Sequence, residues 1–340
     1  MRNDRGVLGR IESAAIKAPC VLALAPPSTP RRRSVILKRV RSEQRVIGVD
    51  LGGTKILAGV LDRDGQAARR TEVPTPTGSQ PELVRGVVEA IESVLDDSVA
   101  AIGLGIPSVI DRKGVALGAT NIPLAGIALG CVLEERFGIP AVVENDANVA
   151  AFGEWKQGAG RGFEDLIMLT LGTGVGGGVV LEGLLFRGWA ELGHLVVLAD
   201  GPRCQGSCTG RGHLEAVASG NAADRAAAEL WGADGNAEQL VARAVEGDDA
   251  ALSSLRAIGR LLGAGIGSLV NVFGAELVVV GGGFGLAAAP FLLEPALEVA
   301  RREALGPARP GLRLVEAELG TDAGLLGAGL LAFGALGPTR

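Results

Sequence analysis

Aromatic side chains are scarce in this sequence. Tyr is absent, and the 340 residues include eight Phe and three Trp. A surface that binds nucleic acid by stacking bases on aromatic rings is therefore not expected. Cysteine is also scarce, with four copies, which are too few in a chain of this size for a disulfide framework. We accordingly expect a protein of the reducing cytoplasm.

Long apolar runs are missing as well. No run reaches the roughly 18 residues that span a membrane, so a membrane partner is not expected. The apolar residues 18–26 precede the basic residues 31–33, which is the reverse of the order found in a secretory signal. We therefore expect neither a membrane-spanning run nor a secretory signal in this sequence.

Charge is unevenly distributed along the chain. Residues 1–45 carry 11 Lys and Arg against three acidic residues, whereas the whole chain has a net charge of −5. The remainder is therefore acidic, which argues against nucleic acid as a partner. We expect residues 1–44 to be a flexible basic extension, or the product of a misassigned start codon.

Glycine, by contrast, is abundant at 53 residues, and its most informative use is a turn that occurs twice. The first copy is VIGVDLGGTKILAGVLD, residues 46–62, and the second is LIMLTLGTGVGGGVVLEG, residues 166–183. Each predicts a β-hairpin with a Gly/Thr turn, and such turns expose backbone N–H groups to an anion. A plain hairpin turn would explain the first copy alone. The two copies together predict two lobes that hold one polyphosphate.

Apolar periodicity elsewhere predicts alternating strands and helices, which is typical of an α/β fold. Leu83, Val87 and Ile91 recur at helical spacing and predict a helix over residues 81–97. Further helical segments are expected over residues 124–137, 147–156, 222–271 and 322–337, and strands over residues 100–106, 141–143 and 277–280. The last helix is rich in small and apolar residues, so we expect it to be buried between other elements.

The triplet Glu144-Asn145-Asp146 joins a predicted strand to a predicted helix. A carboxylate at such a junction can accept a proton from a substrate hydroxyl. Asn and Asp also favour the N-cap position of a helix, where they have a purely structural role. The residues alone leave both interpretations open.

His194, Cys204, Cys208 and His213 form the clearest metal-binding pattern. They include the only two His residues of the chain and two of its four Cys residues, all within 20 positions. Two thiolates and two imidazoles suit tetrahedral zinc, and a Gly-rich loop gains stability from a metal that closes it. Free thiols and surface imidazoles are the alternative. Cys131 lies far from this loop and is expected inside a buried helix.

Taken together, these motifs resemble those of the ROK family, which comprises repressors, open reading frames and sugar kinases. DLGGTK, END, LGTGVGGG, ELGH and the Cys/His loop occur in the family's order over residues 45–337. The resemblance is strongest to the bacterial glucokinase branch. It implies an actin-like ATPase (ribonuclease H-like) fold of two lobes around a cleft, in a homodimer or homotetramer. Residues 45–150 and the C-terminal helix 321–337 would form the small lobe, and residues 151–320 the large lobe with the zinc loop 194–213.

The resemblance also implies roles for individual residues in the transfer of phosphate from ATP to the 6-hydroxyl of an aldohexose. The expected hexose is glucose. Asp146 matches the general base. The hexose ligands would be Asn121, Asn145, Asp146, Glu191, His194 and Glu215. The ATP and Mg²⁺ ligands would be Asp50, Gly52, Gly53, Thr54, Lys55, Gly172, Thr173, Gly174, Gly282 and Gly283. A structural Zn²⁺ would be held by His194, Cys204, Cys208 and His213.

The Cys/His loop departs from the family's pattern, because it has C-x3-C-x4-H where C-x-C-x4-C is usual, with His213 in place of the third Cys. Three alternatives to a glucokinase remain. A kinase for mannose, fructose or N-acetylmannosamine would share every motif, and polyphosphate could replace ATP. A sugar-responsive repressor would need a winged helix-turn-helix, and only 44 Pro-interrupted residues precede the first strand. An actin-like ATPase without kinase activity would not need ELGH or the Cys/His loop.

Overall fold

The computed structural model describes residues 44–111, 113–118 and 122–337, and its frame is a pair of five-stranded mixed sheets. The first sheet has the order β3-β2-β1-β4-β7. In it, β1 pairs antiparallel with β2 and parallel with β4. Its strands are β1 (Arg45–Leu51), β2 (Lys55–Leu61), β3 (Ala67–Pro74), β4 (Val99–Ile106) and β7 (Ala141–Asn145).

The second sheet repeats this topology in the order β10-β9-β8-β11-β12. Its strands are β8 (Leu166–Leu171), β9 (Val175–Leu181), β10 (Leu184–Leu185), β11 (Leu277–Gly281) and β12 (Arg313–Glu316). The two glycine-rich hairpins, β1–β2 and β8–β9, therefore occupy equivalent positions in the two sheets. The predicted α/β class is confirmed, and the repeat in the sequence is a repeat in the fold.

Helices pack against each sheet because each has one apolar face. In α2 (Gln80–Val94), Ser79 caps the N-terminus and Leu83, Val87 and Ile91 are buried against the first sheet. The first sheet also has α3 (Leu129–Phe137) and a small hairpin of β5 (Val109–Ile110) and β6 (Ala116–Gly118). The second sheet is accompanied by α5 (Leu214–Ala218), α6 (Gly220–Trp231), α7 (Ala237–Val245), α8 (Asp249–Phe273) and α9 (Gly283–Glu303).

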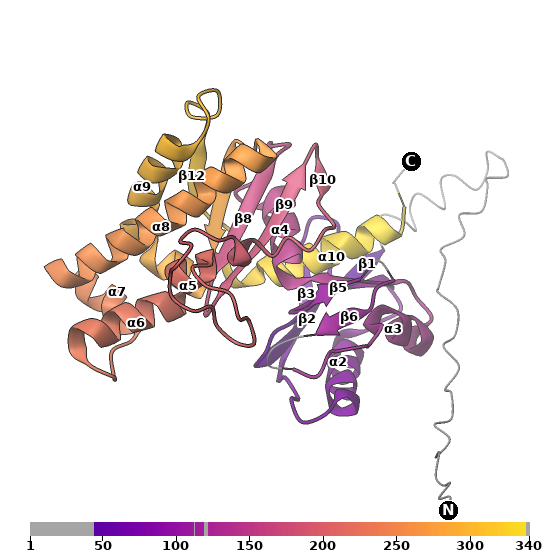
Figure 1. Cartoon of the computed structure of the whole chain (residues 1–340). Helices are drawn as coiled ribbons and strands as arrows, with labels where there is room; N and C mark the ends of the chain where they lie inside the picture. The colour runs from indigo at the N-terminus through magenta and orange to yellow at the C-terminus, as the bar shows by residue number, and fades with distance from the viewer. Residues whose placement is uncertain (1–43, 112, 119–121, 338–340) are drawn as a thin grey trace, which may run out of the picture.

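Two helices, α4 (Asp146–Gln157) and α10 (Ala323–Ala335), connect the halves of the molecule. Figure 1 shows both between the two sheets, with α10 in yellow. α10 packs on α4, β1 and β4, as expected for a buried final helix. Glycines allow this closeness, because a Cβ at Gly103 would overlap the carbonyl of Ala328 and a Cβ at Gly327 would overlap that of Val149. The proposed lobe boundary at residue 150 lies inside α4, which packs against strands of both sheets, and it stays a prediction.

Some boundaries differ from expectation for local reasons. α3 begins at Leu129 and not at residue 124, because Gly126 has a φ of 80° and its N–H bonds to the carbonyl of Ala116. Cys131 on α3 is exposed, so the expected burial is wrong. The segment 222–271 divides into α6, α7 and α8, with Gly232 at a φ of 93° ending α6.

One helix within the described ranges, α9, is long and apolar enough to cross a membrane, with a mean hydropathy of 1.3. It was not among the expected elements. Ala288, Leu292 and Ala296 on this helix are fully buried in the core that also contains Leu262 and Ile266 of α8. These contacts identify α9 as a core helix of the second half of the molecule.

Two glycines of α10 provide a matched test of the close contact with α4. We expect Gly327→Ala to destabilise the fold by about 1–3 kcal/mol, because its Cβ would meet the backbone of Val149 and Gly153. Gly334→Ala on the same helix meets nothing within 4 Å and should be neutral or stabilising. Urea unfolding of both variants measures the difference. Equal stability of the two variants would contradict the close packing.

Candidate active site

Asn145 and Asp146 lie at the junction between β7 and α4, and their side chains make different contacts there. Asn145 is the N-cap of α4: its Oδ1 accepts hydrogen bonds from the N–H groups of Ala147 at 3.0 Å and Asn148 at 3.1 Å. Its Nδ2 donates to the carbonyl of Ser108 at 3.3 Å. Asp146 follows as the first residue of the helix, with one bond from the N–H of Ala147 at 2.8 Å. The capping role therefore belongs to Asn145, and the Asp146 carboxylate is left for chemistry.

Asp146 lies in a cavity of about 220 Å³ together with Asp50, the last polar residue of β1. Burial raises the pKa of Asp50, against the opposing effect of the Lys55 charge. Burial, together with the nearby charges of Asp50 and Glu191, raises the pKa of Asp146 to about 7. A carboxyl group with a pKa near neutrality is suited to general acid–base work. The cavity is also lined by Thr170, Gly282 and Thr321.

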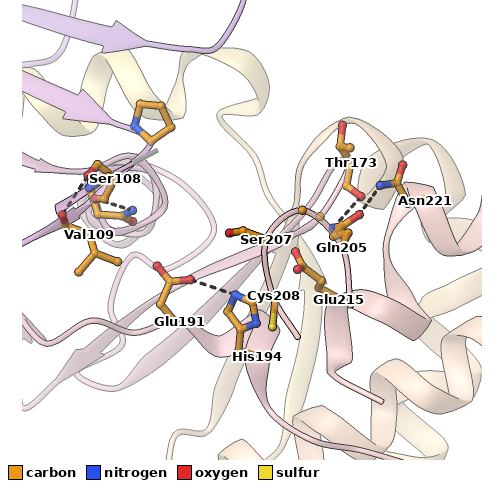
Figure 2. A pocket seen from close by; sticks show the side chains of 15 residues that line it. Ser108, Val109, Thr173, Glu191, His194, Gln205, Ser207, Cys208, Glu215 and Asn221 are labelled. Carbon is orange, nitrogen blue, oxygen red and sulfur yellow. Dashed lines mark hydrogen bonds and ion pairs between the residues drawn. The ribbon is translucent and has the colours of Figure 1, made fainter. Parts of the chain in front are cut away.

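A larger cavity of about 570 Å³ receives polar side chains from both halves of the molecule. Four of the predicted sugar ligands and two residues of the second glycine turn share it: Asn145, Glu191, His194, Glu215, Thr173 and Gly174. Figure 2 shows Glu191 and His194 side by side, and His194 Nε2 lies 4.0 Å from Glu191 Oε2. Burial raises the pKa of Glu191. Asn121, the remaining predicted sugar ligand, lies outside the described residues.

His194, Cys204, Cys208 and His213 meet in one cluster whose ligand atoms all lie within 4.8 Å of one another. The two Nδ1 atoms are 3.1 Å apart, Cys204 Sγ is 3.8 Å from His194 Nδ1, and Cys208 Sγ is 3.7 Å from His213 Nδ1. Ideal tetrahedral zinc with these ligands gives separations of about 3.3–3.8 Å, so the pair at 3.1 Å and the pairs up to 4.8 Å apart need only small side-chain shifts to bind it. The four residues therefore fit a zinc ion, despite the unusual spacing of the loop.

Glu215 at the start of α5 connects this cluster to the second glycine turn. Its Oε2 accepts a hydrogen bond from the N–H of Val175 at 3.3 Å, and its Oε1 accepts one from the Cys204 thiol at 3.2 Å. Burial and this bond to Glu215 raise the pKa of Cys204 to about 12. The thiol is therefore protonated at neutral pH unless a bound cation displaces its proton.

The two predicted phosphate turns have different supports. In the first, the N–H of Gly52 bonds to the carbonyl of Lys55 at 2.9 Å, and the Thr75 hydroxyl donates to the carbonyl of Gly52 at 2.8 Å. The Lys55 ammonium pairs with Glu72 of β3 at 2.9 Å, so this cation is engaged at the edge of the sheet. Gly53 and Thr54 are exposed in the same turn.

In the second turn, the carbonyl of Gly172 accepts from the N–H of Gly220 at 2.8 Å, and Gln205 Nε2 donates to the carbonyl of Thr173 at 3.3 Å. Gly282 is the N-cap of α9 with a φ of 82°. Any larger residue at this position would have its Cβ 2.5 Å from the carbonyl oxygen of Leu171. This packing sets Gly283 and the start of α9 beside the second turn.

Several site residues were not found from the sequence. Gln205 bonds to the second turn and to Asn221, and Ser207 lies beside it in the larger cavity (Figure 2). Ser108 lines the same cavity and holds Asn145. Their residue types are common in loops, so only proximity identifies them. The one available signal was the predicted metal loop, because Gln205 and Ser207 lie between its predicted ligands Cys204 and Cys208.

An ion pair links the two halves of the molecule beside the site. Arg187 Nε lies 3.0 Å from Glu144 Oε2, whose side chain is almost completely buried. The other oxygen, Oε1, accepts bonds from the N–H of Asn145 at 3.0 Å and from Asn148 Nδ2 at 3.2 Å. Glu144 therefore holds the junction in place and connects it to the loop that leads to Glu191.

Comparison with known proteins identifies the family of the chain. The model of the ROK family matches residues 46–334. A glucokinase of Streptomyces coelicolor is 36% identical over 310 residues, covering 84% of this chain and 96% of the relative. An N-acetylmannosamine kinase of Shigella flexneri is 35% identical over 297 residues, covering 85% of this chain and 98% of the relative.

Among solved structures, a ROK family glucokinase from Streptomyces griseus in complex with glucose and AMPPNP is similar, with 37% identity and a TM-score of 0.74. The match covers 85% of this chain and 99% of that one. The two mixed five-stranded sheets described above match this structure, which confirms the expected actin-like fold. The chain therefore belongs to the ROK family, on its glucokinase-like sugar kinase branch.

Proposed function

We propose that this protein transfers the γ-phosphoryl group of ATP to the 6-hydroxyl of an aldohexose, and that the hexose is glucose. The observation that carries the proposal is Asp146, a carboxyl group with a pKa of about 7 beside a polar cavity between the two halves. The solved Streptomyces griseus relative, which is in complex with glucose and AMPPNP, supports the choice of both substrates.

The sugar would occupy the larger cavity. Glu191 and Glu215 supply carboxylate oxygens that accept bonds from hydroxyl groups, and Asn145 has an amide N–H to donate. His194 would contribute Nε2, which faces Glu191. Asn121 is proposed as a further ligand by the family resemblance alone. The Asn145 amide is held by Ser108 and by the start of α4, so it is already oriented before the sugar binds.

ATP would lie between the two glycine turns. The N–H groups of Gly52 and Gly172 close their own turns by bonding to the carbonyls of Lys55 and Gly174. The backbone N–H groups offered to the phosphates would therefore be those of Gly53 and Thr54 in the first turn and of Thr173 and Gly174 in the second. Gly282 and Gly283 would face the adenosine side. Asp50 would hold a Mg²⁺ ion through water, and that ion would neutralise charge on the phosphates. Lys55, now paired with Glu72, would contribute at the edge of this site.

Asp146 would orient the 6-hydroxyl and accept its proton as the oxygen attacks the γ-phosphorus. Phosphoryl transfer has a loose transition state, so positioning and charge neutralisation provide most of the acceleration. Asp50 and Glu191 favour proton uptake because their negative charges raise the pKa of Asp146. Closure of the two lobes would exclude water and so limit hydrolysis of ATP.

A structural zinc ion would be held by His194, Cys204, Cys208 and His213. His194 would bind it through Nδ1, which lies in the cluster, while Nε2 stays available to the sugar cavity. Zinc would thereby fix the loop that also contains Gln205 and Ser207 of the cavity wall.

The choice of sugar has one serious rival. The N-acetylmannosamine kinase relative is 35% identical, against 36% for the glucokinase relative, so similarity separates the two only weakly. Initial rates with glucose, mannose, fructose and N-acetylmannosamine, each with ATP and with polyphosphate, decide between them.

We propose further that the protein is a cytoplasmic homodimer or homotetramer with no membrane or nucleic-acid partner, and that residues 1–44 are an extension outside the catalytic lobes. A repressor of the same family would bind operator DNA in a gel shift and lack turnover.

Asp146→Asn tests the general base. We expect turnover to fall at least about 100-fold, because Asn cannot accept the proton, while glucose binding is retained. A coupled assay with ATP and glucose measures turnover, and calorimetry measures glucose binding. Asp234→Asn, an exposed carboxylate in the turn between α6 and α7, is the control and should keep normal turnover. Near-normal turnover of Asp146→Asn would remove this residue from the base role.

The pH profile tests the same group independently. Because only ionised Asp146 accepts a proton, kcat/KM should fall about tenfold per pH unit below pH 7 and level off above it. The raised pKa also means that the folded state favours the neutral carboxyl, so this group costs stability progressively as pH rises from about 4 to 7. The stability of Asp146→Asn relative to the unsubstituted protein should increase over that range. A flat activity profile down to pH 5 would contradict the assignment.

Zinc content tests the Cys/His cluster. The purified protein should contain one zinc per chain by elemental analysis, and Cys208→Ser should reduce zinc content and thermal stability together. Cys131→Ser, a thiol exposed on α3 outside the cluster, is the matched control and should keep its zinc. Protein prepared without chelators that contains no zinc would rule out the site.

A further inference from the structure

A separate cavity of about 470 Å³ lies where the turn between β2 and β3 approaches the C-terminal end of α4. It shares no lining residue with the cavities around Asp146 and Glu191. Its polar lining comes from Arg63, Asp64 and Gln66 of the turn and from Lys156, Gln157 and Arg161 at and after the end of α4. The first sheet and the connection to the second sheet therefore both contribute to it.

The cavity is basic within an acidic molecule. Arg63, Lys156 and Arg161 line it against one carboxylate, that of Asp64, although acidic residues outnumber basic ones 38 to 33 in the chain. Arg161 pairs with Glu318 at 3.5 Å, and both side chains are more than half exposed, so this pair is weak. In the part of the chain that the structure describes, Arg63 and Lys156 have no carboxylate partner.

Both unpaired cations are nevertheless held in place. The Arg63 guanidinium stacks 4.9 Å from the centre of the Phe333 ring, and the Lys156 ammonium lies 3.3 Å from the centre of the Trp155 ring. The Nε of Arg63 is buried and has no acceptor among the described residues, which is unusual for a buried donor. Burial lowers the pKa of Lys156, as expected for a cation that lacks a counter-ion. Cations that are already oriented lose little entropy when an anion binds.

We propose that this cavity binds a small phosphate-bearing anion, such as a phosphomonoester or a short oligophosphate. Arg63 and Arg161 would contact phosphate oxygens through their planar guanidinium groups, and Lys156 would add a third charge. The amides of Gln66 and Gln157 provide uncharged donors at the same cavity. The cavity has room for a hexose phosphate or for an oligophosphate of several units.

The anion would be coupled to the catalytic cavity through buried Glu154 on α4. Its Oε2 accepts bonds from the N–H groups of Ala159 at 2.9 Å and Glu318 at 3.1 Å, and its Oε1 accepts one from Leu319 at 2.7 Å. Glu154 thus ties the end of α4 to the segment between β12 and α10. That segment lines the anion cavity at Leu319 and the cavity of Asp50 and Asp146 at residues 317, 320 and 321.

An anion that draws Arg63 towards Lys156 and Arg161 would therefore pull on both connections between the sheets. The anion cavity and the cavity of Asp50 and Asp146 are thus separate sites. Both are connected to α4 and to the segment that leads into α10. Two distinct sites that share connecting segments are what coupling between binding sites requires. This coupling, unlike the binding itself, rests on the proposed kinase activity.

Binding is tested by calorimetry at constant ionic strength, with the catalytic cleft saturated by glucose and a non-hydrolysable ATP analogue. Separate titrations use inorganic phosphate, hexose 6-phosphate and tripolyphosphate, so that the preferred source of the phosphate group is identified. We expect one site per chain for at least one of them, with affinity reduced at least tenfold in the Arg63→Gln, Lys156→Gln double variant. Arg85→Gln, Arg260→Gln removes two exposed charges elsewhere and should leave the affinity unchanged.

Arg161→Gln is a second probe, because Arg161 is exposed and its replacement leaves the stacking on Phe333 intact. It should weaken binding even if the double variant folds poorly. Absence of binding, or equal affinity in the double variant, Arg161→Gln and the control, would overturn the site.

For the coupling, the preferred anion should change the KM for ATP or sugar about fivefold in the unsubstituted protein and not in the variants. Binding without any such change would overturn the coupling, and absence of sugar phosphorylation would overturn the kinase proposal while the binding result still stands.

Discussion

The close backbone contact between α4 and α10 is the constraint on which the rest of the molecule depends. Gly327 of α10 lies against the carbonyl of Val149, and Gly103 of β4 lies against that of Ala328. Side chains at these positions would force the helices away from each other and from the first sheet. Because α4 and α10 are also the segments that join the two sheets, their packing fixes how the two halves face each other.

The position of the Asp146 carboxylate depends on the packing of α4 against α10. It is the first residue of α4, so the helix that packs against α10 also delivers the carboxylate to the boundary between the sheets. Burial there, with Asp50 nearby, accounts for a carboxyl group that titrates near neutrality. Asn145 satisfies the helix N-terminus, and Glu144 ties the junction to Arg187 on the other half. Three consecutive residues therefore have different roles: Asn145 caps the helix, Glu144 ties the junction to the other half, and Asp146 is the proposed general base.

Local patterns in the sequence predicted the elements that depend on local physics. The two glycine-rich hairpins, the amphipathic α2 and the Cys/His cluster all have signals within about 20 residues, and the structure contains each of them. The start of α3 was wrong because a bond between Gly126 and Ala116 ends the preceding turn. Gln205, Ser207 and Asn221 could not be identified, because what distinguishes them is their place around the cavity that Thr173 also lines, which the fold creates. The resemblance to ROK proteins, and not periodicity, supplied the remaining site residues.

The imidazole of His194 faces two ways, with Nδ1 in the Cys/His cluster and Nε2 towards Glu191 in the larger cavity. A proton or a metal on one ring nitrogen sets whether the other donates or accepts. Occupancy of the cluster and affinity for whatever lies beside Glu191 are therefore not independent quantities. If zinc binds Nδ1 as proposed, its loss would change the affinity for a ligand beside Glu191 as well as the stability of the loop.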